Sequence, residues 1–224
     1  MSDPRNIGHR ARLRGKLLSD PDSLADYEVL ELLLSIAVPR RDVKPLAKDL
    51  LSRFKSFSGV VHADFPVLSE VKGVGPAAAA AVKIVEASCV RALRSEASRR
   101  PVIADWPALV DYCRMSIGCR AAEEFHVLYL DAKCNLIRDE VHSSGTVNFS
   151  GVYPREVLKG VLAAGASSVI LVHNHPSGDT SPSRADIEMT KRIVQALAGV
   201  DVAVHDHLVV SQDGVSSFAA LGLL

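Results

Sequence analysis

Three side chains that could hold a metal ion lie close together in the segment SSVILVHNHPSGDTSPSRAD, residues 167–186. The apolar run VILV predicts a buried strand. His173 and His175 follow it two residues apart, so both imidazoles face one side. Asp186 falls in the first turn of a helix that Ser183 can cap. Two imidazoles and a carboxylate, with a fourth position left for water, are the ligand set of a catalytic zinc site.

The spacing of these residues resembles the signature of the JAMM (MPN+) metalloprotease domain, His-x-His-Pro, six residues, then Ser-x-x-Asp. The longer string HNHPSGD, with Asp206 and His207 downstream, is similar to the RadC (UPF0758) branch of that family. The resemblance covers essentially the whole chain. It implies a domain that binds Zn²⁺ through His173, His175 and Asp186.

The same resemblance implies a glutamate that acts as general base, about 50 residues before the first histidine. Glu123 and Glu124 are the candidates, and the Glu-x-Phe spacing of RadC-like chains favours Glu123 over Glu124. An exposed charge at a strand edge is the alternative for either residue. Ser183 has two compatible roles, because helix capping uses an oxygen lone pair. By resemblance, its hydroxyl also donates to an oxyanion.

A zinc ion at this site would lower the pKa of water from 15.7 toward about 7. Water could then attack a peptide or isopeptide carbonyl, if a base takes the proton and a donor holds the oxyanion. Nucleobase deamination is another zinc chemistry, but it requires P-C-x-x-C, which the chain lacks. Packing histidines are the remaining alternative, although two of them at a strand end, with a spaced aspartate, are unusual.

A second H-x-H occurs at His205-Asp206-His207, without the proline, serine and spaced carboxylate that accompany the first. The resemblance maps a family Asp-His pair onto Asp206 and His207. It implies that these two residues support a metal ligand from behind. A purely structural role and a second metal site are the alternatives.

The composition fits an intracellular protein with one large domain or two small ones. The chain has 224 residues, of which 48% are hydrophobic and 23% charged. No stretch approaches the ~18 apolar residues of a membrane span, and the N-terminus lacks the apolar core of a signal peptide. Four scattered cysteines fit a reducing compartment. We therefore expect a cytoplasmic location and no membrane partner.

Hydrophobic periodicity divides the chain into a helical part and a mixed part. Helices are expected at 5–18 and 43–54 and after Pro76, with no confident strand before residue 100. The polar segment EASRRP predicts a boundary between a helical domain, 1–98, and a second domain, 101–224. The second domain alternates expected strands and helices. With the resemblance, this predicts an α+β fold: an all-α domain, then a JAMM/MPN-type (cytidine-deaminase-like) mixed sheet with flanking helices.

Charge is unevenly distributed along the chain. Residues 1–100 carry 17 Lys+Arg and 12 Asp+Glu, a net +5, and residues 101–224 carry 9 and 14, a net −5. The turn KGVGP resembles the hairpin of a helix-hairpin-helix module, whose backbone N–H groups can hold a phosphate. Related turns place a lysine where this chain has Ala78, so a purely structural turn is the alternative.

Two function classes follow from these patterns. The first is a zinc-dependent hydrolase of peptide or isopeptide bonds, with a peptide or protein substrate. The second is a nucleic-acid-associated protein that contacts DNA through its N-terminal domain, and the resemblance to the RadC family implies a role in repair or recombination. A third possibility joins them, with the helical part delivering the hydrolase to substrates on DNA.

Overall fold

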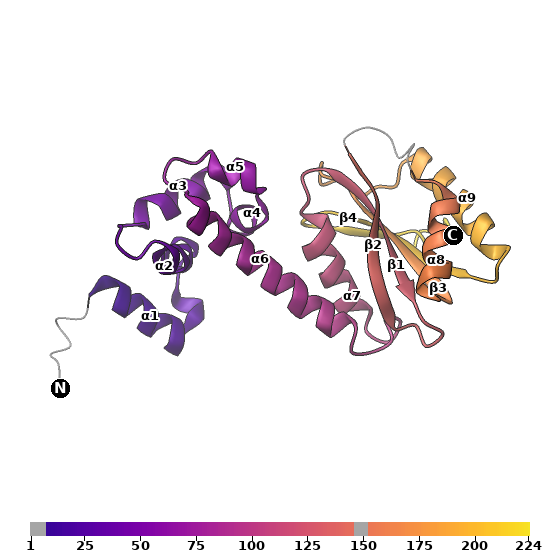
Figure 1. Cartoon of the computed structure of the whole chain (residues 1–224), viewed down its shortest axis with the longest axis horizontal. Coiled ribbons are helices and arrows are strands. Elements are labelled where there is room, and N and C mark those ends of the chain that lie inside the picture. Colours follow the sequence, from indigo (N-terminus) through magenta and orange to yellow (C-terminus); the bar gives the residue numbers. More distant parts are fainter. Residues whose placement is uncertain (1–7, 146–151) are drawn as a thin grey trace. The chain divides into compact units, whose positions relative to one another are not determined.

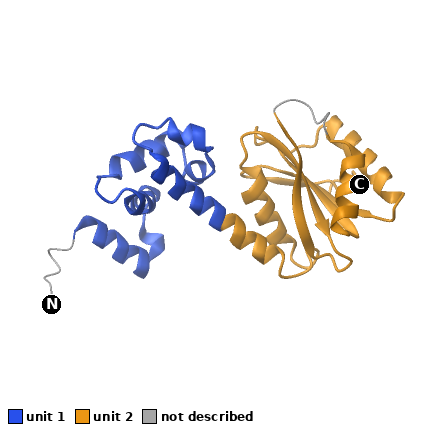
Figure 2. Ribbon diagram, viewed as in Figure 1, with its two compact units in different colours: residues 1–88 blue, residues 89–224 orange. Residues whose placement is uncertain are grey.

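The structure is a computed structural model that describes residues 8–145 and 152–224 (Figure 1). The chain divides into two compact units, residues 1–88 and 89–224 (Figure 2). None of the described helices is both long and apolar enough to cross a membrane.

The first unit consists of helices within its described residues, as the sequence predicts. They are α1 (His9–Ser19), the 3-10 turn η2 (Pro21–Ser23), α2 (Asp26–Ala37), α3 (Lys44–Phe54), α4 (Phe57–His62), α5 (Phe65–Ser69) and the start of α6 (Pro76–Ala97). Residues 5–7 of the helix expected at 5–18 lie outside the described residues. Buried Leu30, Leu50 and Leu68 belong to one apolar core that joins α2, α3, α4, α5 and the start of α6. The short helices α4 and α5 were not predicted.

The second unit is a five-stranded mixed sheet with helices on both faces. Its elements are α7 (Trp106–Cys113), the π-helical turn η3 (Arg114–Gly118), β1 (Glu123–Leu130), β2 (Leu136–Gly145), α8 (Pro154–Ala164), β3 (Ser168–Asn174), α9 (Arg184–Ala198), β4 (Ala203–Val210) and β5 (Val215–Ser217). The strand order is β2-β1-β3-β4-β5, with β3 and β4 parallel and the other neighbours antiparallel. The predicted α+β class, an all-α region before a mixed sheet, is confirmed.

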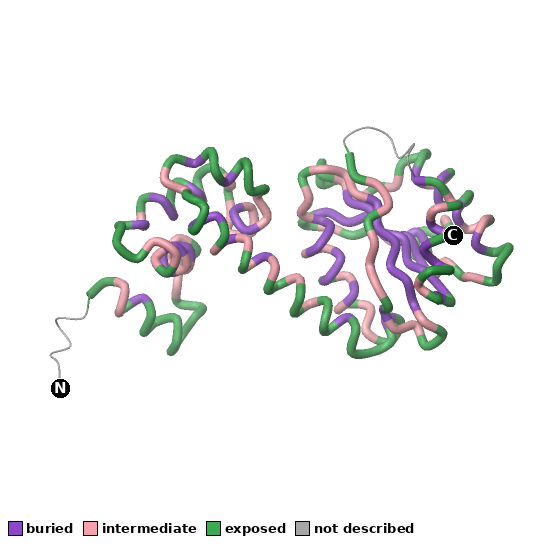
Figure 3. Tube along the Cα trace, viewed as in Figure 1, coloured by how far each residue is buried: buried purple, intermediate pink, exposed green. Residues whose placement is uncertain are grey.

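The two faces of the sheet bury different apolar cores. Odd-numbered residues of β1 and β3 pack with α8 and α9, and even-numbered residues pack with α7 and the end of α6. The separation follows from the two-residue period of a strand. Both strands are therefore almost wholly buried (Figure 3).

The last turns of α6 belong with the second unit. Val90, Leu93 and Ala97 contribute to the core on the α7 face of the sheet. The compact units accordingly divide within α6, between Ser88 and Cys89. The domain ranges 1–98 and 101–224 stay a prediction.

A chain of polar side chains crosses the core on the α7 face. Tyr112 donates a hydrogen bond of 2.7 Å to Asp139, whose other oxygen lies 2.8 Å from Nδ1 of His126. Nε2 of the same imidazole lies 3.1 Å from Glu124. Burial lowers the pKa of His126, but the two carboxylates outweigh burial and the net shift is upward. Burial likewise raises the pKa of Asp139, and contact with the imidazole reverses that shift.

We predict that His126→Gln destabilises the protein most in mildly acidic solution. A histidine whose folded pKa is raised contributes stability that is complete below its unfolded pKa of about 6.5 and is lost as pH rises through the folded pKa. The difference in melting temperature between wild type and variant should therefore shrink above neutral pH. It should also shrink in strong acid, as the pH falls through the lowered pKa of Asp139. Thermal melts over a pH series measure it.

His142→Gln is a matched control, because burial lowers the pKa of His142. Its difference from wild type should change in the opposite direction, with wild type losing relative stability as the pH falls below about 6.5. A difference for His126→Gln that does not vary with pH would contradict the ion-pair assignment.

Candidate metal centre

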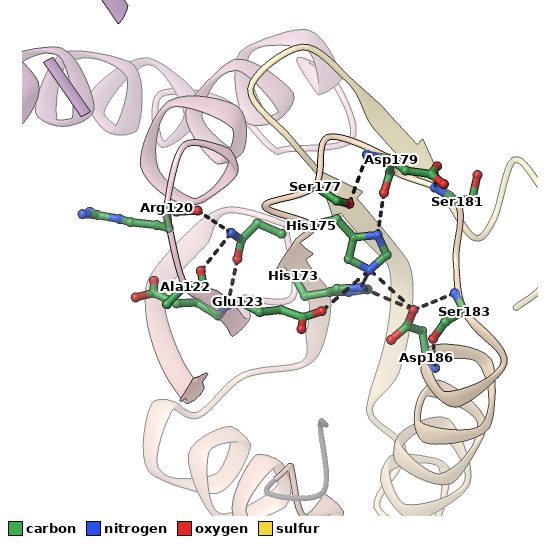
Figure 4. A network of polar contacts seen from close by, with 12 residues as sticks. Arg120, Ala122, Glu123, His173, His175, Ser177, Asp179, Ser181, Ser183 and Asp186 are labelled. Carbon is green, nitrogen blue, oxygen red and sulfur yellow. Dashed lines mark hydrogen bonds and ion pairs between the residues drawn. The ribbon is translucent and has the colours of Figure 1, made fainter. Parts of the chain in front are cut away.

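The sheet brings the predicted site residues to one face. Phe125 of β1 pairs with His173 of β3, so Glu123 and His173 project from neighbouring strands toward α8 and α9. His175 follows β3 in the loop, and Asp186 lies in the first turn of α9. Figure 4 shows their four side chains converging. In the described part of the chain, Glu123, His173 and His175 form a group whose ligand atoms all lie within 4.8 Å of one another.

One donor atom each from His173, His175 and Asp186 forms a triangle of a size that suits zinc. Nε2 of His173 and Nε2 of His175 are 3.1 Å apart, and Oδ2 of Asp186 lies 3.6 Å from the first and 3.7 Å from the second. A point equidistant from all three atoms lies about 2.0 Å from each, which matches zinc bonds to nitrogen and oxygen of about 2.0–2.2 Å. The donor set therefore fits a zinc ion.

A series of hydrogen bonds fixes the tautomer of His173, so that its Nε2 directs a lone pair toward His175 and Asp186. The hydroxyl of Thr190 donates to the carbonyl of Asp186 at 2.6 Å, so its oxygen accepts from Nδ1 of His207 at 2.6 Å. Nε2 of His207 then accepts from Nδ1 of His173 at 2.8 Å. The tautomers are inferred from these partners. They leave Nε2 of His173 without a proton.

His175 has the same orientation by a shorter route. Its Nδ1 lies 2.6 Å from the carbonyl oxygen of Asp179, which can only accept, so Nδ1 carries the proton. Nε2 of His175 thus faces Nε2 of His173 with a second lone pair. Two lone pairs at 3.1 Å repel unless a positive charge lies between them. The site requires a cation, either a metal ion or a proton.

The carboxylate of Asp186 adds negative charge to this buried site. It is fully buried, and its Oδ1 has no hydrogen-bond partner. Burial alone would raise the pKa of Asp186, but His173, His175 and Ser183 outweigh burial and hold the pKa well below its usual range. A buried carboxylate with an unpartnered oxygen is a second sign that the site accommodates a cation.

Ser183 caps α9 as predicted and also holds Asp186. Its Oγ accepts from the backbone N–H of Asp186 at 3.2 Å, while its own N–H donates to Oδ2 of Asp186 at 2.7 Å. This reciprocal pair is a capping box. The hydroxyl proton of Ser183 makes no bond to any described residue, so it remains free to donate to a substrate.

The two glutamate candidates project from opposite faces of the sheet. Oε1 of Glu123 lies 3.8 Å from Nε2 of His175, beside the ligand triangle. The carboxylate of Glu124 instead contacts His126 on the α7 face. Adjacent strand residues must diverge in this way. Glu123 is thus placed to act as base, although that role stays a prediction.

Asn174, between the two histidine ligands, holds the strand that carries Glu123. Its fully buried side chain accepts from the N–H of Glu124 at 2.7 Å and donates to the carbonyls of Arg120 and Ala122 at 3.0 Å each. The start of β1 is therefore fixed to the end of β3.

The downstream pair Asp206-His207 separates into two roles. His207 touches His173 directly, and it lies between the rings of Phe125 and Phe218. Burial lowers its pKa well below the ordinary value. In the described part of the chain, Asp206 contacts neither His173 nor His175, and it accepts from Ser217 and the N–H of Ala219. The neighbouring His205 approaches Cys134 rather than this site.

Comparison with protein families agrees with this site. A family model described as a RadC-like JAB domain matches residues 103–223, more than half of the chain. The chain belongs to the RadC-like JAB family. A second model, described as UPF0758 N-terminal, matches residues 5–80 of this RadC-like chain. The resemblance to the RadC (UPF0758) family is therefore confirmed.

One residue of this RadC-like site was not among the predicted site residues. Thr190 lies one helical turn after Asp186, and its hydroxyl begins the hydrogen-bond chain that reaches His173 through His207. The only signal in the sequence is the four-residue spacing, which places Thr190 and Asp186 on one side of α9.

We predict that Thr190→Val weakens zinc binding about 10- to 100-fold, the range for partners that orient metal ligands. The valine keeps the shape of the buried threonine but cannot accept from Nδ1 of His207, so the tautomer of His173 is no longer fixed. Competition with a chromogenic chelator measures the affinity. Thr180→Val is the control, because the hydroxyl of Thr180 is hydrogen-bonded to Ser216 and takes no part in the bonds that join Thr190, His207 and His173. Equal zinc affinity in both variants would contradict the tautomer chain.

Proposed function

We propose that this chain is a zinc-dependent metallohydrolase of the JAMM type that cleaves peptide or isopeptide bonds in a peptide or protein substrate. The observation that carries the proposal is the ligand triangle of His173, His175 and Asp186, with two lone pairs that require a cation. We further propose that it acts in the cytoplasm, where its four free cysteines stay reduced.

Bound zinc would supply Lewis acidity, which polarises a carbonyl and lowers the pKa of water. The residues of the chain would do the rest. Glu123 would accept the proton of the attacking water and pass it to the leaving amine. The free hydroxyl of Ser183 would donate a hydrogen bond to the developing oxyanion.

Access to the site supports this division of roles. The side chains of His173 and Asp186 are completely buried, whereas those of His175 and Glu123 are 16% and 25% exposed. A cavity of about 510 Å³ lies beside His175, lined in part by Gly118, Gly178 and Ser211. Arg120 and Ala121, which lie just before the start of β1, also line this cavity, so a substrate chain could approach His175 here.

We predict that Glu123→Gln abolishes hydrolysis but keeps zinc. Removing a general base costs about 10²- to 10⁴-fold in rate. Zinc-loaded wild type and variant would be screened against peptide and isopeptide libraries, with zinc content measured by mass spectrometry. Glu124→Gln is the matched control, because it makes the same change one residue away on the opposite face of the sheet.

The results separate the possible errors. Loss of activity with stoichiometric zinc in Glu123→Gln, together with full activity in Glu124→Gln, supports the assigned base. Equal activity in wild type and Glu123→Gln would show that another group takes the proton. Zinc below stoichiometric amounts in wild type, unchanged by His173→Ala, would refute the proposal itself.

A further inference from the structure

A cavity of about 740 Å³ in the first unit carries an excess of positive charge. It lies between α1, the middle of α2 and the loop before α3. Five cationic side chains contribute to its lining: Arg10, Arg14, Arg40, Arg41 and Lys44. We call these five residues the arginine cluster. Two carboxylates also line the cavity, so the balance before any pairing is five positive charges against two negative ones.

Both carboxylates are engaged by the protein. One oxygen of Glu31 lies 3.0 Å from Nε2 of His9, and its other oxygen is buried without a hydrogen-bond partner. Asp42 accepts from the N–H of Lys44 at 3.1 Å, at the start of α3. Neither carboxylate forms an ion pair with the arginine cluster in the described residues, and the five cationic side chains exceed the two carboxylates by three charges.

The arginines have different local roles. Arg10 donates to the carbonyls of Pro39 and Arg41, which fixes the loop between α2 and α3. Arg14 and Arg40 are exposed and make no ion pair or hydrogen bond with any described residue. The charges of these two side chains are therefore available to a ligand.

Arg41 extends the cluster to the hairpin turn between α5 and α6. Its guanidinium donates to the carbonyl of Gly73 at 3.3 Å. Gly73 has φ +102°, which favours glycine, and a Cβ there would lie 2.7 Å from that guanidinium. Both the backbone conformation and the close approach of Arg41 therefore require glycine at this position. Ala78 of the same hairpin is fully buried in the core and offers no place for a solvent-facing cation. Lys72 of the turn is exposed, and Arg41 adds a second positive charge there from the loop before α3.

We propose that the arginine cluster is a binding site for the phosphates of a nucleic-acid backbone. Arginine forks match phosphate oxygens in geometry and stay charged at any physiological pH. The cavity exceeds the needs of a single phosphate. Its free charges come from separate elements, Arg14 on α1 and Arg40 on the loop before α3, which suits successive phosphates along a strand. Contacts of this kind position a strand without reading its sequence.

The test uses the full-length chain and a fluorescent DNA duplex of mixed sequence, titrated between about 50 and 200 mM salt. The test variant is Arg14→Gln/Arg40→Gln, which leaves the structural bonds of Arg10 and Arg41 in place. The control is Arg99→Gln/Arg100→Gln, which removes the same charge from two exposed arginines outside the cavity. Inorganic pyrophosphate serves as a second probe, to distinguish a nucleic-acid backbone from a free phosphate ligand.

The proposal expects duplex binding that weakens steeply with salt. The test variant should bind about tenfold more weakly at the lowest salt, and its slope of log K against log salt should decrease by about 2, because each phosphate contact contributes about 0.9. The control should bind like wild type. No duplex binding by wild type, or equal losses in both variants, would overturn the proposal. Tight pyrophosphate binding that duplex does not compete away would also overturn it, in favour of a free phosphate ligand. Zinc content stays unchanged in every case, so this test is independent of the proposed hydrolase.

Discussion

Buried lone pairs that face one another are the constraint on which the metal centre depends. Nε2 of His173 and Nε2 of His175 lie 3.1 Å apart, and a carboxylate oxygen of Asp186 completes the triangle. Such a group is unfavourable in an apolar interior without a compensating positive charge. A proton on His175 can supply that charge, because Asp186 raises the pKa of His175. Metal binding must then displace the proton, which links metal affinity to pH.

Because successive residues of a strand face opposite sides of the sheet, the start of β1 contributes to two separate polar sites. Glu123 and Glu124 are neighbours in sequence, yet one reaches the ligand triangle and the other a histidine on the far face. Asn174 holds β1 against β3 at this point, so the two carboxylates cannot exchange places without breaking its three hydrogen bonds. Strand register thus decides which of the two adjacent carboxylates faces the candidate metal centre.

Local sequence patterns predicted features that lie within a short stretch of chain, but they did not predict the contacts between residues far apart in the sequence. His173, His175, Ser183 and Asp186 were predictable because a strand end, a loop and a helix start follow one another within a few residues. The contact of Thr190 with His207 joins α9 to β4, and no residue spacing in the sequence predicts it. Strand β5 and the helices α4 and α5 were also missed, since each is too short for periodicity to show.

The hairpin turn illustrates why local likeness is an incomplete guide to electrostatics. Comparison with related turns suggested a lost charge at Ala78, but that side chain belongs to the core of the first unit. The guanidinium beside the turn comes from Arg41, more than thirty residues earlier, held there by a glycine carbonyl. The charge near this turn therefore depends on where distant side chains end in space as well as on the residues of the turn itself. The same holds at the metal centre, where His207 orients His173 from a strand that follows it by 34 residues.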